Sequence, residues 1–358
     1  MRSTVFVIGA GASAEVNFPT GVELKNILSR ILDIKYDSYG NLSSGDPVIG
    51  CGIKEMCLQS GDSVKTNREI RDFMDVFRRI KKHLPLSPSI DNYIDSNRGD
   101  KKISLCGKIG LVKTILLKEK ESLLYVNTDT EKTLNYSALE ETWYTKLFHL
   151  ITESSNKSDA KSKLANLIFI VFNYDRCFEY FMYHALKDFY ALSDAEIIEW
   201  MKSLKIYHPY GSVGALPFEK KNDSIGFGAN VSYEQMLLCS QRICTFTERI
   251  DDKLGVIEDI RGIIINAAKI VFLGFSFLPI NMSLLFGEKN KRIDKKSMPI
   301  CYATTYKLSD YNIMHVKNSI ASNFGKNDVQ VRYLIADINT KSCKCVELFD
   351  EFNRGLYI

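Results

Sequence analysis

The residues of this chain that are able to do chemistry stand at the ends of apolar runs. Gly9, Gly11 and Ser13 follow the run Val-Phe-Val-Ile at 5–8. This pattern predicts a buried parallel strand that enters a tight turn. Glycines let a backbone approach a phosphate, and N–H groups of such a turn can point at it. The segment 9–13, with Ala10 and Ala12, therefore predicts a nucleotide phosphate site; the alternative is a strand that ends in a flexible turn.

A carboxamide and a carboxylate end the second apolar run. Asn173 and Asp175 lie two residues apart, so they share one face of a strand. Together they suit the hydroxyls of a sugar or a carboxamide ligand. The alternative is that one of them caps the helix that follows. Glu179 lies one helical turn beyond Asp175 and can face the same site.

An imidazole and a phenol stand together in the segment that ends with Gly211 and Ser212. His208 and Tyr210 are two residues apart and point the same way if the segment is extended. Imidazole titrates near neutral pH, which suits a general base acting on a hydroxyl. A structural histidine is the alternative.

Two later runs also end in small polar residues. Gly274 and Ser276 close the third run, and Thr304 lies in a weaker fourth one. A glycine there allows a ligand to approach closely, and a serine can bond a phosphate or a ribose. The alternative for this segment is a cap on the next helix.

The elements that must position these residues follow from hydrophobic patterning. Apolar runs predict parallel strands at 4–10, 167–175, 269–276 and 299–305, with a short strand at 205–211. Helical patterns lie between or beside them, at 19–30, 176–188, 194–203, 232–243 and 254–268. Strands that alternate with helices predict an α/β protein with a Rossmann-like, doubly wound parallel sheet. Ligands of such sheets bind at the carboxyl ends of the strands, where the residues above converge.

Other segments depart from this alternation. Residues 36–66 are rich in turn-forming residues and predict a loop or mobile flap. Residues 67–150 show helical periodicity, and 154–163 predict a polar loop, so 67–165 are expected to form a helical insertion within one domain, 1–358. Residues 212–230 are expected to wrap the site.

Composition excludes several classes of protein. The chain has 358 residues, of which 45% are hydrophobic and 25% are charged, as expected for a globular protein. Its net charge of +4 is small and its Lys and Arg are scattered, so direct nucleic-acid binding is not expected. The basic runs at 78–83 and 289–296 are interpreted as solvated faces. Apolar runs too short for a bilayer and the absence of a leader pattern favour a cytoplasmic protein that does not enter membranes.

The cysteine pattern argues against a metal site. Nine cysteines in a cytoplasmic chain are expected to be free thiols. Cys343 and Cys345 form a single C-x-C without a second pair at zinc spacing, so no metal is expected.

Four motifs in order resemble the sirtuin-like (silent information regulator) superfamily. They are G-A-G-x-S at 9–13, N-x-D at 173–175, a histidine–glycine segment at 208–212 and G-x-S at 274–276, so the resemblance covers roughly 1–30 and 165–310. It implies a Rossmann-like sheet that binds NAD, with 9–13 at the pyrophosphate and Asn173 and Asp175 beside the nicotinamide ribose. Gly274 and Ser276 would then bind the adenosine side. The cofactor is also expected to contact Tyr210, Gly211, Ser212 and Thr304.

Two departures from the superfamily narrow this resemblance. Its deacetylases bind zinc through paired C-x-x-C motifs, which this chain lacks, so the chain is more similar to the zinc-less sirtuin-like NADases of bacterial anti-phage defence. That implies hydrolysis of NAD, as substrate, to nicotinamide and ADP-ribose, with His208, Asn173 and Asp175 catalytic. It also implies a homo-oligomer or a partner defence protein. Tyr210 occupies the place of the family histidine, so His208 or Tyr210 fills that role, or the histidine function is lost. A non-catalytic NAD or ADP-ribose sensor and an NAD-dependent protein deacylase are the alternatives.

Overall fold

A six-stranded, all-parallel sheet organises the structure. The computed structural model describes residues 3–59, 63–127, 133–219, 224–245, 247–248, 255–287, 298–325 and 327–357. The strands are arranged in the order β5-β4-β1-β6-β7-β8. Counted along the chain within this sheet, that order is 3-2-1-4-5-6, the arrangement of the classical dinucleotide-binding fold. The predicted Rossmann-like, doubly wound fold is thus confirmed. The strands are β1 Thr4–Ile8, β4 Leu167–Val171, β5 Lys205–Tyr207, β6 Lys269–Leu273, β7 Ile300–Thr304 and β8 Ile338–Lys341.

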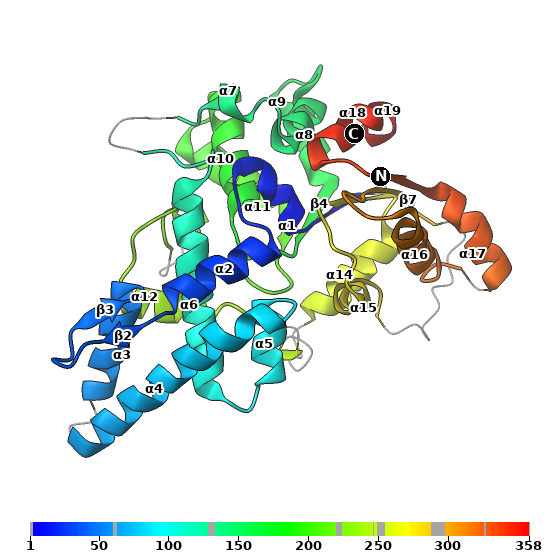
Figure 1. Ribbon diagram of the computed structural model, residues 1–358. Coiled ribbons are helices and arrows are strands. Elements are labelled where there is room, and N and C mark those ends of the chain that lie inside the picture. Colours follow the sequence, from blue (N-terminus) through cyan, green and yellow to red (C-terminus); the bar gives the residue numbers. More distant parts are fainter. Residues whose placement is uncertain are drawn as a thin grey trace.

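Helices cover both faces of this sheet (Figure 1). The helices are α1 Ala10–Ser13, α2 Gly21–Ile31, α3 Pro47–Leu58, α4 Ser63–His83, α5 Ile90–Ser96, α6 Lys101–Glu121, α7 Tyr136–Leu139, α8 Trp143–Thr152, α9 Lys157–Ala165, α10 Cys177–Phe189, α11 Asp194–Ser203, α12 Tyr233–Ser240, α14 Val256–Asn266, α15 Pro279–Phe286, α16 Asp310–Ala321, α17 Asp328–Leu334, α18 Cys345–Glu351 and α19 Asn353–Leu356. A small hairpin, β2 Lys35–Tyr36 and β3 Leu42–Ser44, precedes α3.

Alternation along β1 explains why the strands read as continuous apolar runs. Val5 and Val7 belong to a core that includes side chains of α14, α15 and α16. Phe6 and Ile8 belong to a second core, which α2, α6, α8 and α10 share. Because both faces of the sheet are buried, neither set of alternating positions can be polar.

The predicted helical insertion is confirmed between β1 and β4. Helices α4 to α9 lie within residues 63–165, and α6 packs against α2, α4, α5 and α12. Figure 1 shows α4, α5 and α6 gathered with α2, α3 and α12 in one lobe, while α16 and α17 lie at the opposite side of the molecule.

Two predicted loops are wrong. The segment 36–66 contains the β2–β3 hairpin and helix α3, whose first turn is capped by Asp46 accepting from the N–H of Ile49. The segment 154–163 contains most of α9, which Asn156 and Asp159 cap reciprocally. Capping residues and loop residues have the same composition, and this explains both errors.

The C-terminal part of the chain adds elements beyond those predicted. Strand β8 pairs with β7 and completes the sheet, followed by α18 and α19. Its sequence, INTK, has no apolar run because it forms the outer strand of the sheet.

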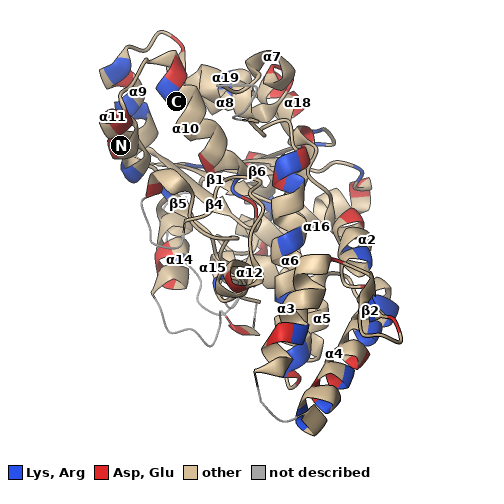
Figure 2. Cartoon of the chain, turned by 90° about the vertical axis from the view of Figure 1, so that its left-hand side faces the viewer, with Lys and Arg blue, Asp and Glu red and all other residues tan. Residues whose placement is uncertain are grey.

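Charge on the insertion is mixed in sign and partly paired. Figure 2 shows both signs along α4. Within the basic run at 78–83, Arg79 pairs with Asp100 and Lys81 pairs with Asp33. Among the described residues, no helix is both long enough and apolar enough to cross a membrane.

Three glycines bring the β1–α1 turn against the β6 turn, where the strand order reverses. The Gly9 N–H donates to Leu273 O at 2.9 Å, and the Gly11 N–H donates to Gly274 O at 3.0 Å. A Cβ on Gly274 would lie 2.1 Å from the Ala12 nitrogen, and the φ of Gly274 is +56°. Glycine is therefore required by backbone packing.

The same turn is anchored by its neighbours. Glu15, just after α1, accepts from the N–H of Trp143 at 2.8 Å and from the N–H of Val346 at 2.9 Å. One carboxylate thus meets the N-terminal ends of α8 and α18. The indole N–H of Trp143 also donates to Ala12 O at 2.9 Å.

Gly274→Ala tests this packing. We expect it to lower the free energy of unfolding by at least about 2 kcal/mol, since it combines a left-handed backbone with a clash. Gly262→Ala is the control, because a Cβ at that position in α14 meets nothing within 4 Å. It should be neutral or stabilise by about 0.5–1 kcal/mol. Urea unfolding measures the free energy of unfolding of both variants. Equal values for the two would contradict the packing argument.

Candidate functional site

The β1 and β4 ends are joined by a buried polar network. Asn173 Nδ2 donates to Gly9 O at 3.1 Å and to Ser13 Oγ at 3.0 Å. Ser13 Oγ in turn donates to Asp175 Oδ2 at 2.9 Å, and Asp175 Oδ1 accepts from the N–H of Cys177 at 3.1 Å. Ser13, Asn173 and Asp175 are 2%, 7% and 5% exposed. These side chains hold the glycine turn in place, and Asp175 also accepts a hydrogen bond from the N–H of Cys177, the first residue of α10.

A histidine–carboxylate pair lies beside this network. His208 Nε2 contacts Glu179 Oε1, and His208 Nδ1 lies 3.3 Å from Asn173 O. The second carboxylate oxygen, Glu179 Oε2, is buried and has no hydrogen-bond partner within the described residues. Oε1 of Glu179 is therefore used in the contact with His208, whereas Oε2 can still accept a hydrogen bond.

Glu179 and His208 line a cavity of about 480 Å³ that extends from the residues after β4 and β5 along the edge strand β5 to Met201 of α11. Its other lining residues include Arg176, Ser212, Phe218 and Arg242. Such a volume lies within the range of small-molecule sites. Asn173 and Asp175 are not part of its lining, so the carboxylate offered to a ligand is that of Glu179.

Burial and neighbouring charges shift the titration of these groups. Burial raises the pKa of Asp175, although hydrogen bonds from Cys177 and Ser13 oppose it. Burial disfavours the charged form of His208, but the Glu179 carboxylate and the carbonyl of Asn173 outweigh it, so the pKa of His208 is raised. His208 therefore favours the imidazolium form more than an ordinary histidine does.

Tyr210 lies apart from the histidine–carboxylate pair. Its hydroxyl donates to Asn281 Oδ1 at 2.6 Å, at the start of α15. Burial raises the pKa of Tyr210 far above its ordinary value. His208 and Tyr210 thus do not share a ligand-facing position, although their spacing suggested one. The phenol is also a poor base at neutral pH.

The remaining predicted residues lie along the same edge of the sheet. Thr304 Oγ1 accepts from the N–H of Gly274 at 2.8 Å. Gly211 has a φ of +77° and packs on Arg242 O, and Ser212 lines the cavity. Ser276 is exposed. In the glycine turn, Ala12 is buried and its N–H donates to Gly9 O, whereas Ala10 and Gly11 are exposed.

Sequence reasoning missed a buried ion pair beside the cavity. Arg176 and Glu119 are 2% and 0% exposed and form a two-point contact, Nη2 to Oε2 at 2.5 Å and Nε to Oε1 at 2.9 Å. Glu119 is a charged residue on an otherwise buried face of α6, which is a usable signal, but nothing in the sequence identifies its partner.

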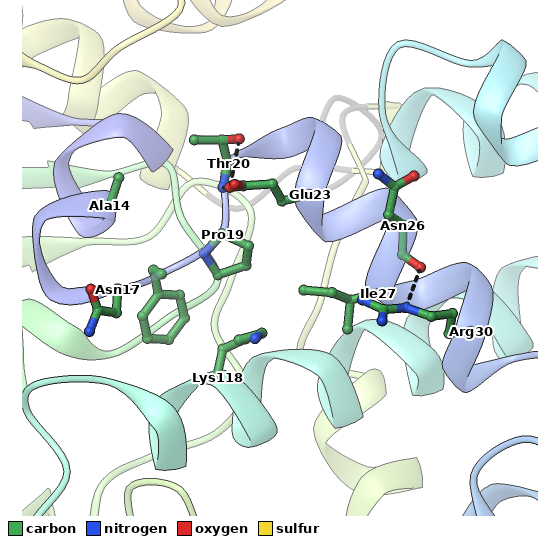
Figure 3. A pocket seen from close by; sticks show the side chains of 10 residues that line it. Ala14, Asn17, Pro19, Thr20, Glu23, Asn26, Ile27, Arg30 and Lys118 are labelled. Carbon is green, nitrogen blue, oxygen red and sulfur yellow. Dashed lines mark hydrogen bonds between the residues drawn. The ribbon is translucent and has the colours of Figure 1, made fainter.

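A second cavity, of about 580 Å³, opens beyond the glycine turn between α2 and α6 (Figure 3). Thr20 and Glu23 bond each other along its wall, and Arg30 donates to the carbonyl of Asn26. None of the sequence-predicted site residues lines it. The histidine–carboxylate cavity is therefore the candidate site.

The fold and this site show an α/β protein with a Rossmann-like sheet and a cavity of mixed polarity beside its edge strand β5. Among the described residues, no group of three or more His, Cys, Asp or Glu side chains is placed to hold a metal ion. No family model, no curated protein and no solved structure matches this chain. The sirtuin-like resemblance consequently stays a prediction.

Two histidines provide a test of the site's electrostatics. We expect the pKa of His208 to lie above the ordinary value of a histidine and that of His184, half-buried on α10, to lie at about 4 because burial disfavours its charged form. The stabilising contribution of His208 is complete below about pH 6.5 and is lost as the pH rises through its folded pKa. Histidine NMR titration of the protein and of Glu179→Gln measures this. In Glu179→Gln the pKa of His208 should fall, because burial is then less opposed, and an unchanged value would contradict the assignment.

Proposed function

We propose that this protein binds NAD and hydrolyses its nicotinamide–ribose bond, giving nicotinamide and ADP-ribose. The observation that carries the proposal is Glu179, a carboxylate with one buried unpartnered oxygen that lines a cavity beside the edge strand β5 of a Rossmann-like sheet. The order of the motifs and the strand order support a dinucleotide.

The chemistry assigns roles different from those that the motifs imply. Breaking the bond develops positive charge on the ribose, which the Glu179 carboxylate would stabilise. The imidazolium of His208 would keep Glu179 ionised and oriented. In the neutral form of His208, the imidazole would accept the proton of the attacking water as its oxygen bonds the ribose carbon and nicotinamide leaves, which returns His208 to the imidazolium. Asn173 and Asp175 would act as positioning residues under the glycine turn, since they are buried away from the cavity.

A non-catalytic NAD or ADP-ribose sensor is the second candidate. The observation that favours it is Tyr210, which stands in the place of the family histidine and is bonded to Asn281. A role in anti-phage defence, as a homo-oligomer or with a partner protein, is part of the proposal and rests on the resemblance alone. The proposed cytoplasmic location rests on the short apolar runs of the sequence.

Removing the carboxylate tests the catalytic assignment. Glu179→Gln and His208→Ala should each lower NAD hydrolysis by about a hundredfold or more, the scale of a lost general acid–base group. Glu199→Gln is the matched control, since Glu199 is exposed on α11 and pairs with Lys161 of α9. Chromatography of nicotinamide and ADP-ribose measures the rate. Full activity of Glu179→Gln would refute its role, and NAD binding without cleavage by the unaltered protein would favour the sensor.

The phosphate site is tested at Ala10, which is exposed in the glycine turn. A side chain on Gly11 would not separate binding from folding, because its Cβ would lie 2.9 Å from Gly274 Cα. Ala10→Asp places a negative charge beside the expected pyrophosphate and should weaken NAD binding at least about tenfold. Ala10→Asn introduces an uncharged side chain of nearly the same shape, so this variant should bind NAD more tightly than Ala10→Asp does. Calorimetric titration with NAD compares them, and equal affinities would place the pyrophosphate elsewhere.

A further inference from the structure

Four consecutive residues after β4 are held from two directions. Asn173 and Asp175 bond the glycine turn and its Ser13, as described above. The residues between and after them, Tyr174 and Arg176, bond the helical insertion instead. The segment 173–176 therefore joins the insertion to the turn at the strand-order reversal.

The first of these links is the ion pair of Arg176 with Glu119 on α6. Its remaining guanidinium donors reach the carbonyls of Ile225 at 2.7 Å and Gly226 at 3.2 Å. Glu119 Oε2 also accepts from the N–H of Gly228 at 2.9 Å. The pair thus joins α6, the start of α10 and residues 225–228 around one buried charge centre, and Arg176 forms part of the cavity wall.

The second link is a hydrogen bond from the Tyr174 hydroxyl to Asp91 on α5. Tyr174 is 7% exposed, and its hydroxyl also lies 3.4 Å from Cys244 O. The stretch 242–244 packs in turn on the segment of Tyr210 and Gly211, through Cys244 N–H to Tyr210 O at 3.0 Å. This link therefore reaches the segment that follows His208.

We propose that Tyr174 and Arg176 are positioning residues through which the helical insertion sets the geometry of the glycine turn and of the cavity. A partner that shifts α5 or α6 would then alter the site without touching it. The part concerning catalysis rests on the proposed function, whereas the structural coupling does not.

Amide hydrogen exchange of the full-length protein tests the coupling without any ligand. Tyr174→Phe removes only a hydroxyl, and Glu119→Gln breaks the ion pair. Tyr174→Phe should accelerate exchange at the hydrogen-bonded amides of Gly9, Gly11 and Ala12 by at least tenfold, while α16 on the opposite face keeps its protection. Glu119→Gln also lowers the stability of the whole fold, so there the acceleration at these amides should exceed that at α16 by at least tenfold. Glu121→Gln, an exposed substitution on the same helix α6, should change neither.

Two outcomes would overturn the coupling. One is faster exchange confined to α5, α6 and 225–228 with the glycine turn unchanged, and the other is a uniform increase that includes α16. If the unaltered protein hydrolyses NAD, Tyr174→Phe should lower kcat more than it changes KM. If it does not hydrolyse NAD, the proposed function fails and the exchange result still decides the coupling.

Discussion

The close backbone contact between the β1–α1 turn and the β6 turn is the constraint on which the site depends. It occurs where the strand order reverses, and it requires the absence of a Cβ at Gly9, Gly11 and Gly274. The contact uses the N–H groups of Gly9 and Gly11 as donors to the β6 turn. The glycines of this motif therefore serve the protein's own packing, and any phosphate would meet only the exposed part of the turn, at Ala10 and Gly11.

A second consequence concerns charge. Arg176 and Glu119 are stripped of water, so each depends on the other and on surrounding backbone groups for its stabilisation. Removing one partner of such a pair generally costs about 3–5 kcal/mol, whereas an apolar replacement of both is often tolerated. Keeping an ion pair at this point is therefore poorly explained by stability alone. Its location, between the insertion and the cavity wall, agrees better with a need for fixed geometry.

The fold was largely predictable because a sheet that is buried on both faces requires continuous apolar runs, which are easily recognised in the sequence. Because helices cover both sides of the sheet, every position of a run such as 167–171 must be apolar. Segments without such a run were missed: β8 lies at the sheet edge, and α3 and α9 begin at Asp46 and Asn156, residues equally typical of turns. For the site, spacing was sufficient to suggest Glu179 but not to separate His208 from Tyr210. That separation depends on contacts with Asn281 and Glu179, which a periodic pattern does not encode.

The contacts of Glu15 constrain the order in which parts of the fold can form during synthesis. Its carboxylate lies near the start of the chain, yet one of its two backbone partners belongs to residue 346. Strand β1 likewise pairs with residues 167–171 and 269–273, which are synthesised later, so β1 must wait for two distant strands. Long-range closure of this kind is slow, and it leaves early segments exposed in the meantime. The glycine turn, although it precedes these strands in the chain, therefore cannot reach its final form before they are in place.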